Sequence, residues 1–195
     1  MRASNSVTVV IPSIPPRATK LARALSSALS QTYPVDAIAI PMDHGRIGAP
    51  ANRQAGLETV KTEWVAFLDD DDFFKENHVG DLLDAALDND ADFVYSWYEM
   101  LGGEDPRPEV FGKPWDNDNP VQTTITTLVK TDLAKSVGFV WDGDDLDSPD
   151  RLVAGEDWFF TKGCMDAGAK IYHHPERTWT WRHWGANTSG LPSRW

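Results

Sequence analysis

Four consecutive aspartates, Asp69 to Asp72, directly follow a short apolar run, Trp64 to Leu68. The apolar run predicts a buried strand, so the carboxylates come at its carboxyl end. Like charges a few ångströms apart raise one another's pKa, and a divalent cation relieves that cost. Carboxylate oxygens suit Mg²⁺ or Mn²⁺, which are usually shared with substrate phosphates. A solvated turn is the simpler explanation, but the position after a buried strand favours a binding site.

A second acidic pair, Glu156 and Asp157, follows Gly155 at the start of a helix predicted over 156–167. Acidic residues are favoured in a first helical turn, so capping alone explains this pair. The functional hypothesis is that the helix directs a carboxylate into a cleft. Asp157 would then act as a general base, and Glu156 would orient it.

A histidine near the end of the chain is a candidate third metal ligand. His183 lies between Arg182 and Trp184, and an imidazole often completes a site with two carboxylates. Core packing of a His beside Trp is the alternative, and His173 and His174 are competing candidates. The neighbouring Arg182 offers a bidentate contact to a phosphate.

The first half of the chain alternates strands with helices, which predicts a parallel sheet covered on both faces. Strands are expected at 7–11, 37–40, 64–68 and 92–98, and helices at 19–33, 50–60 and 77–87. Open α/β sheets bind ligands outside the carboxyl ends of their strands. Asp43 follows the second strand and Asp69 to Asp72 follow the third, so we expect them at one ligand-binding edge.

The second half has a different pattern. We expect a Gly- and Pro-rich loop over 99–120, a strand over 123–129, a helix over 131–138, and short strands at 170–173 and 178–182. Five aspartates in 142–150 are expected to form a solvated loop, because the closing Glu of an EF-hand is absent. No repeat or linker divides the chain, so a single domain over 1–195 is predicted.

Composition narrows the function further. The chain has 195 residues, with 30 Asp and Glu against 18 Lys and Arg, giving a net charge of -12. Such a charge repels phosphate backbones, so general nucleic-acid binding is not expected. The lone Cys164 excludes an internal disulfide and a Cys-rich zinc site, and we expect it to be a buried helix residue. Without an apolar run of about 18 residues or a signal-peptide core, a cytoplasmic protein without a membrane span is expected.

Tryptophan is abundant and concentrated late in the chain. Five of the nine tryptophans fall in residues 158–195. Tryptophan faces stack well on sugar rings and on bases. This end of the chain is therefore expected to contact a ligand.

Taken together, these segments resemble a family 2 glycosyltransferase with the GT-A fold. The segments that carry the resemblance are VVIPS (9–13), LSSALSQTYP (25–34), GAPANRQAG (48–56), WVAFLDDDD (64–72), GED (155–157), and His183 with Asn187 and Ser189. Their order and spacing cover about residues 7–190. The sequence departs from the family pattern at Pro15 and Pro16, at 43–46 (Asp-His-Gly-Arg) and at Gln54, so it does not identify the nucleobase.

The resemblance implies an α/β GT-A fold, with a mainly parallel central sheet flanked by helices. It implies a nucleotide-sugar-binding half over 1–98 and an acceptor-binding and catalytic-base half over 99–195. It places Pro12, Ser13, Asp43, Arg53 and Asp70 on the nucleotide, with Asp43 and Arg53 near the base and Asp70 near the ribose. It places Asp69, Asp71 and His183 on Mn²⁺ or Mg²⁺, in a DXD motif.

The resemblance also implies a reaction. Asp157, assisted by Glu156, would deprotonate an acceptor hydroxyl and displace the nucleoside diphosphate with inversion. The expected donor is a nucleoside diphosphate sugar, and the expected acceptor is a small molecule, a glycan or a hydroxylated nucleobase. A nucleotidyltransferase, a retaining transferase on the same fold and a non-catalytic sugar-nucleotide or carbohydrate-binding protein are the alternatives.

Overall fold

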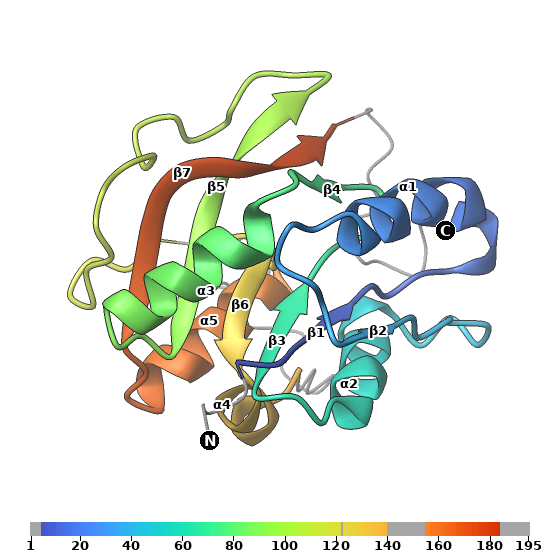
Figure 1. Cartoon of the computed structure of the whole chain (residues 1–195), viewed down its shortest axis with the longest axis horizontal. Coiled ribbons are helices and arrows are strands. Elements are labelled where there is room, and N and C mark those ends of the chain that lie inside the picture. The colour runs from blue at the N-terminus through green and yellow to red at the C-terminus, as the bar shows by residue number, and fades with distance from the viewer. Residues whose placement is uncertain (1–4, 122, 140–154, 184–195) are drawn as a thin grey trace, which may run out of the picture.

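The computed structural model describes residues 5–121, 123–139 and 155–183. Within them the chain builds a seven-stranded sheet in the order β2-β1-β3-β6-β5-β7-β4, with helices on both sides (Figure 1). The strands are β1 (Val7–Val10), β2 (Ala37–Ala39), β3 (Trp64–Phe67), β4 (Phe73–Phe74), β5 (Phe93–Leu101), β6 (Thr127–Lys130) and β7 (Ile171–Arg182). The helices are α1 (Ala18–Leu29), α2 (Ala49–Thr59), α3 (His78–Asp88), α4 (Thr131–Val137) and α5 (Glu156–Asp166).

The sheet is mixed, but five of its seven strands run in one direction. β1 is parallel to β2 and β3, and β5 is parallel to β7. β6 runs antiparallel to both β3 and β5, and β4 antiparallel to β7. The prediction of a mainly parallel sheet is confirmed. The strand-helix alternation did not predict that β6, from the second half of the chain, separates β3 from β5.

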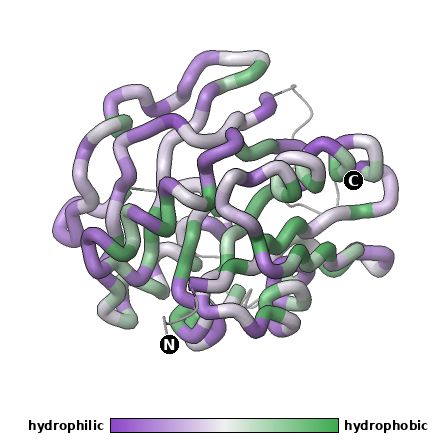
Figure 2. The backbone as a smooth tube through the Cα atoms, viewed as in Figure 1, coloured by the Kyte–Doolittle hydropathy of each residue, from purple (hydrophilic) through white to green (hydrophobic). Residues whose placement is uncertain are grey.

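The sheet core is apolar because helices cover both of its faces. Every residue of β1 and of β3 is buried, as expected for central strands with no solvent-exposed side. In Figure 1, α3 crosses in front of the sheet and α5 lies behind it. Phe160 of α5 packs edge-on against Phe67 of β3, with ring centroids 5.7 Å apart. The backbone coloured by hydropathy shows the same apolar centre (Figure 2).

A close approach of α2 to β1 depends on Gly56. A Cβ at this position would lie 2.6 Å from Cγ1 of Val10 and 2.9 Å from Cγ of Pro41. Such distances are too short for any side chain, so only glycine lets the helix pack this closely. The consequence is that Asn52 and Arg53, one turn earlier in α2, are held at the carboxyl edge of the sheet.

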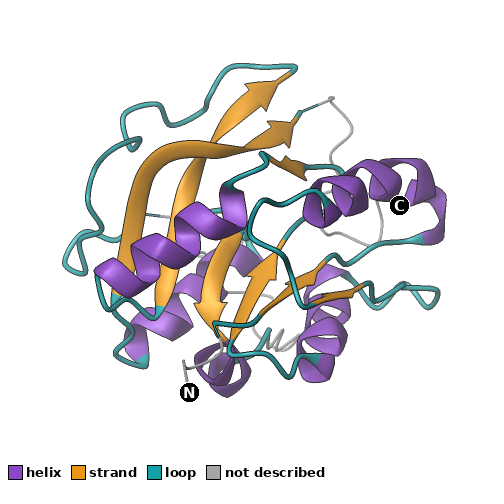
Figure 3. Ribbon diagram, in the orientation of Figure 1, coloured by secondary structure: helices purple, strands orange, loops and turns teal. Residues whose placement is uncertain are grey.

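Two strand predictions were wrong in detail, one in each half of the chain. The segments expected as separate strands around Pro175 form one strand, β7, because register shifts beside Ser96 and Trp97 accommodate the proline region. The two-residue β4 was not predicted, and Figure 3 shows it beside the end of β7. In the described part of the chain, no helix has the length and apolar content to cross a membrane.

Candidate functional site

A cleft of about 430 Å³ opens at the carboxyl ends of β1 and β3. It collects nearly all of the predicted site residues: Pro12, Ser13, Asp43, Arg53, Asp69, Asp70, Asp71, Glu156 and Asp157. The prediction that the aspartate run lies at the carboxyl edge of the sheet is confirmed. Residues from both halves of the chain meet here, so the cleft has the two walls that a transfer between two substrates requires.

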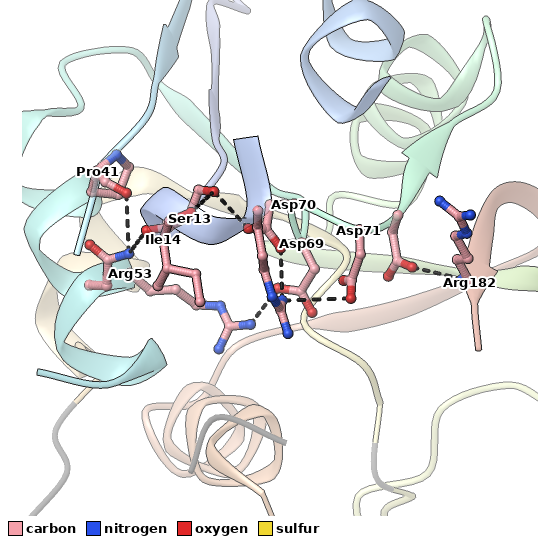
Figure 4. Close-up of polar contacts among 11 residues, drawn as sticks. Ser13, Ile14, Pro41, Arg53, Asp69, Asp70, Asp71 and Arg182 are labelled. Carbon is pink, nitrogen blue, oxygen red and sulfur yellow. Dashed lines mark hydrogen bonds and ion pairs between the residues drawn. The ribbon is translucent and has the colours of Figure 1, made fainter. Parts of the chain in front are cut away.

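Asp70 is fixed from two directions. Its carboxylate accepts hydrogen bonds from Oγ of Ser13 at 2.7 Å and from Nη1 of Arg17 at 2.9 Å (Figure 4). Arg17 also lies 3.6 Å from Asp71. Burial raises the pKa of Asp70, and the bonds from Ser13 and Arg17 oppose that shift. Arg17 was not predicted as a site residue, although its position directly after Pro15 and Pro16, close behind the first strand, was a usable signal.

Arg53 joins the aspartate run to the start of α5. Its Nη2 donates to Oδ1 of Asp69 at 2.5 Å (Figure 4), and its Nη1 donates to Oε1 of Glu156 at 2.5 Å. Nη1 also lies 3.8 Å from Oδ1 of Asp157. Burial lowers the pKa of Arg53, but the three carboxylates outweigh burial and raise it, so the guanidinium stays charged.

The carboxylate of Asp43 is hydrogen-bonded to the backbone of its own loop. It is 4% exposed, and its two oxygens accept the backbone N–H groups of Gly45 and Gly48 at 2.9 and 3.1 Å. These bonds close the turn between β2 and α2. The resemblance grouped Arg53 with Asp43, whereas the structure directs the Arg53 guanidinium toward Asp69 and α5.

Asp72 ties the aspartate run to the end of β7. The backbone N–H of Arg182 donates to its Oδ1 at 2.8 Å, and the carboxylate is nearly fully buried. Burial, together with the charge of Asp69, raises the pKa of Asp72 well above its usual range. This contact brings the second half of the chain against the acidic edge.

The predicted metal trio of Asp69, Asp71 and His183 is not assembled. His183 is exposed outside the cleft, where its N–H donates to the Leu101 carbonyl and its ring lies beside Gly103. Among the described residues, no three His, Cys, Asp or Glu side chains are placed to hold one metal ion. The carboxylates that remain fit an ion that also takes oxygens from a substrate diphosphate.

The competing histidine has a structural role. His173 is buried and stacks on Tyr95, with ring centroids 4.5 Å apart. Its Nδ1 lies 2.6 Å from the carbonyl oxygen of Lys113. Burial lowers its pKa. The aspartates of 142–150 and residues Trp184, Asn187, Ser189 and Trp195 lie outside the described residues.

Asp157 occupies the first turn of α5 at the cleft. Its side chain is 27% exposed, yet Oδ1 is buried without a hydrogen bond among the described residues and faces Arg53. Burial and the neighbouring charge of Glu156 raise the pKa of Asp157, whereas Arg53 and a backbone hydrogen bond from Ile125 act in the opposite direction. A carboxylate in this setting is able to accept a proton near neutral pH.

The opposite wall of the cleft is aromatic. It is formed by Tyr95, Trp97, Tyr98, Trp179 and Trp181 from β5 and β7. Tyr98 packs edge-on against Trp179 and Trp181, with centroids 5.3 and 5.0 Å apart. The late tryptophans were expected to contact a ligand, and the structure places Trp179 and Trp181 at the cleft. The aromatic residues of β5 were not predicted as site residues, because in the sequence they belong to an apolar segment typical of a buried strand.

Asp105 anchors the loop after β5 to this wall. Its carboxylate accepts hydrogen bonds from Nε1 of Trp97 at 2.6 Å and from the hydroxyl of Tyr98 at 2.8 Å. It also accepts the backbone N–H of Arg107 at 2.9 Å. The loop is thereby fixed where Pro106 and Arg107 line the cleft.

Comparison with known proteins agrees with this arrangement. Residues 18–109 match the model of the family described as glycosyl transferase family 2. This segment resembles family 2 glycosyltransferases. It contains α1, α2 and the whole aspartate run, so the family resemblance predicted from the motifs is confirmed. No curated protein matches the chain significantly.

Solved structures show the same fold. The chain resembles S. aureus TarS 1-349 in complex with UDP-GlcNAc, with a TM-score of 0.77, 15% identity and 94% of this chain covered. The complex of TarS 1-349 with UDP gives a TM-score of 0.71, 15% identity and 93% coverage. The chain spans 60 and 61% of the length of these two proteins. Its α/β sheet, with five strands in one direction and helices on both faces, is a GT-A fold.

Proposed function

We propose that the chain transfers a sugar from a nucleoside diphosphate sugar to an acceptor hydroxyl. The observation that carries the proposal is the meeting of Asp69 to Asp72 with Asp157 in one cleft at the carboxyl edge of the sheet. A donor seated on the aspartate run would present its anomeric carbon toward α5. The UDP-GlcNAc and UDP complexes of the TarS structures support a nucleotide sugar as the donor.

The donor diphosphate needs positive charge, and the cleft has two sources. Arg17 and Arg53 provide fixed guanidinium groups beside the aspartate run. We propose that Asp71, with Asp69, also holds Mn²⁺ or Mg²⁺ together with diphosphate oxygens. When bound, such an ion stabilises the negative charge that develops on the leaving nucleoside diphosphate.

Asp157 is the proposed general base. It would accept the proton of the acceptor hydroxyl as that oxygen attacks the anomeric carbon from the face opposite the leaving group. A single displacement of this kind inverts the anomeric configuration, by the logic that applies to inverting glycosidases. Glu156 is bonded to Arg53 and keeps the first turn of α5 against the donor side.

The aromatic wall is the proposed acceptor side. Trp181, the ring of this wall that is only partly buried, offers ring surface for a glycan, another hydroxylated small molecule or a hydroxylated nucleobase. The net charge of -12 argues against unmodified duplex DNA bound through its backbone. Tight binding of such DNA with a steep salt dependence would contradict this assignment.

A thermal-shift screen with Mn²⁺ identifies the donor. Nucleoside diphosphates and their sugars, beginning with UDP-GlcNAc, should raise the unfolding temperature if they bind the folded cleft. With the selected donor, neutral saccharides and a hydroxymethylated nucleoside are then tested as acceptors, and the product anomer is read by NMR. Release of pyrophosphate from a sugar phosphate and nucleoside triphosphate would instead indicate a nucleotidyltransferase. Donor binding without any transfer would indicate a binding protein.

A further inference from the structure

Arg53 is the one cation that contacts both parts of the proposed reaction centre in the described structure. It bonds Asp69 at the donor edge and Glu156 on α5, and it lies 3.8 Å from Asp157. The other arginine of the acidic edge, Arg17, pairs with Asp70 and Asp71. In the described part of the chain, Arg53 thus connects the aspartate run to α5, whereas the ion pairs of Arg17 are with the run itself.

The burial of this contact makes it directional. The Arg53 side chain is 5% exposed and Glu156 is 15% exposed, so the bond to Glu156 forms away from bulk water, whereas Asp69 at the other end is 35% exposed. A planar guanidinium binds two carboxylates in a fixed geometry that an ammonium group cannot reproduce. The first turn of α5 is thus held at a set distance from the end of β3.

The same contact balances charge. Asp69, Glu156 and Asp157 carry three carboxylates around one guanidinium. Without Arg53 these carboxylates would repel one another, and Asp157 would lose the cation that its Oδ1 faces. The orientation of Asp157 toward the cleft therefore depends on the arginine.

We propose that Arg53 is a positioning residue, which acts on the reaction through Asp157 by fixing the start of α5 against the donor edge. The inference rests on the proposed function, because it takes Asp157 to be the base. It differs from the role that the family resemblance gave to Arg53, which was a contact to the nucleobase.

A double-mutant cycle separates these roles. The single variants Arg53→Met and Asp157→Asn and the double variant are assayed for release of UDP from UDP-GlcNAc, or from another donor chosen by the shift screen. Arg53→Met should lower kcat by roughly 10- to 100-fold, since a misplacement of about 1 Å in a reacting group costs about 100-fold. In the Asp157→Asn background the same change should lower kcat by less than about threefold, because groups that act as a unit are not additive.

Arg17→Met is the matched control. It removes the same type of side chain from the same cleft without touching α5, so its effect should multiply with that of Asp157→Asn. Donor affinity, measured by calorimetry, should change less than kcat in Arg53→Met. Arg53→Lys, which keeps the charge, should recover folding and only part of kcat.

The outcomes are distinct. Independent, multiplicative effects of Arg53→Met and Asp157→Asn in folded proteins would overturn the inference and leave the proposed function standing. If Arg53→Met lowered only the affinity for the donor, Arg53 would be a nucleotide contact and the inference would be overturned. If Arg53→Lys recovered kcat in full, the charge alone would suffice, and the inference would also be overturned. If the wild-type protein bound nucleotide sugars but never transferred the sugar, the proposed function would be overturned, and this inference with it.

Discussion

The two walls of the cleft are built on different physical principles. The donor edge consists of carboxylates, each held by an arginine, a hydroxyl or a backbone N–H, as Asp70 is held by Ser13 and Arg17. The aromatic wall consists of packed rings, and one carboxylate, Asp105, fixes the polar atoms of Trp97 and Tyr98. A charged wall fixes a ligand by position and charge, and a ring surface accepts many hydroxylated shapes. Under the proposed function, we therefore expect strict recognition of the donor and adaptable recognition of the acceptor.

Of the changes to the two walls, the larger effect is expected at the charged wall. Asp71→Ala, or removal of divalent ions with EDTA, should lower sugar transfer by on the order of 10²–10³-fold, since such an ion supplies several kcal/mol of charge stabilisation. Binding of UDP in the presence of Mn²⁺, followed by calorimetry, should weaken in parallel. Full activity in excess EDTA would show that Arg17 and Arg53 suffice without a metal.

The matching test of the aromatic wall is Trp181→Ala. Stacking of a planar ligand on an aromatic side chain is worth about 1–3 kcal/mol, so KM for the acceptor should rise about tenfold while donor affinity stays unchanged. Trp115→Ala is the control, because Trp115 packs against Tyr95 and donates to Asn117 without lining the cleft. Equal losses from both changes would mean that the aromatic cluster acts only as core.

The sequence predicted the charged wall better than the aromatic wall. Carboxylates directly after a buried strand are exceptional in type and position, and an acidic pair at the start of a helix is exceptional too. The sequence therefore predicted that Asp69 to Asp72 and Asp157 lie in one cleft. Tyr95 and Trp97 occupy positions where any buried strand has apolar residues. Their exposure to the cleft depends on the register shifts in β5 and on the path of β7, which are properties of the folded sheet.

The sequence predicted the partners of these carboxylates less well. A short motif gives no distance between segments, so the link from Arg53 to Glu156, 103 positions away, could not be derived from spacing. His183 was chosen because imidazole is a common ligand, but β7 continues to Arg182 and carries it outside the cleft. The insertion of β6 between β3 and β5 likewise depends on long-range pairing.

A stability measurement tests the packing that supports the aromatic wall. His78 is fully buried, its Nδ1 lies 2.7 Å from Oγ1 of Thr178 in β7, and it stacks on Phe74. Burial lowers its pKa to about 3, below the value of about 6.5 in the unfolded chain. Its neutral form therefore contributes stability above pH 6.5, and this contribution is lost as the pH falls below 6.5.

Denaturant unfolding at several pH values measures this loss. The free energy of unfolding should fall by up to about 1.4 kcal/mol per pH unit between pH 6 and pH 4 through His78. His78→Gln should remove this contribution from the slope. The remaining slope comes from His173, whose pKa burial also lowers, and from buried carboxyls such as Asp72 and Asp157, whose raised pKa acts in the opposite direction. An unchanged slope in the variant would show that His78 is not held neutral in the fold.

The smallest effect is expected from an ion pair outside the cleft. Lys75 and Glu99 are 2.7 Å apart, but their side chains are 40 and 56% exposed. Glu99→Gln should change the free energy of unfolding by less than about 0.5 kcal/mol and leave transfer unchanged, because water and salt screen exposed pairs. A larger loss would mean that ion pairs matter throughout this acidic protein and not only where they are buried.

The measurement that tests the central claim most directly is turnover by Asp157→Asn with donor affinity determined on the same protein. Asparagine keeps the size of the side chain and its ability to cap α5, but it cannot accept the proton. Turnover should fall by roughly 10²–10⁴-fold, with the fold and the affinity for the nucleotide sugar retained. Near-normal turnover, or a loss explained by unfolding alone, would contradict the account and reduce Asp157 to a helix cap.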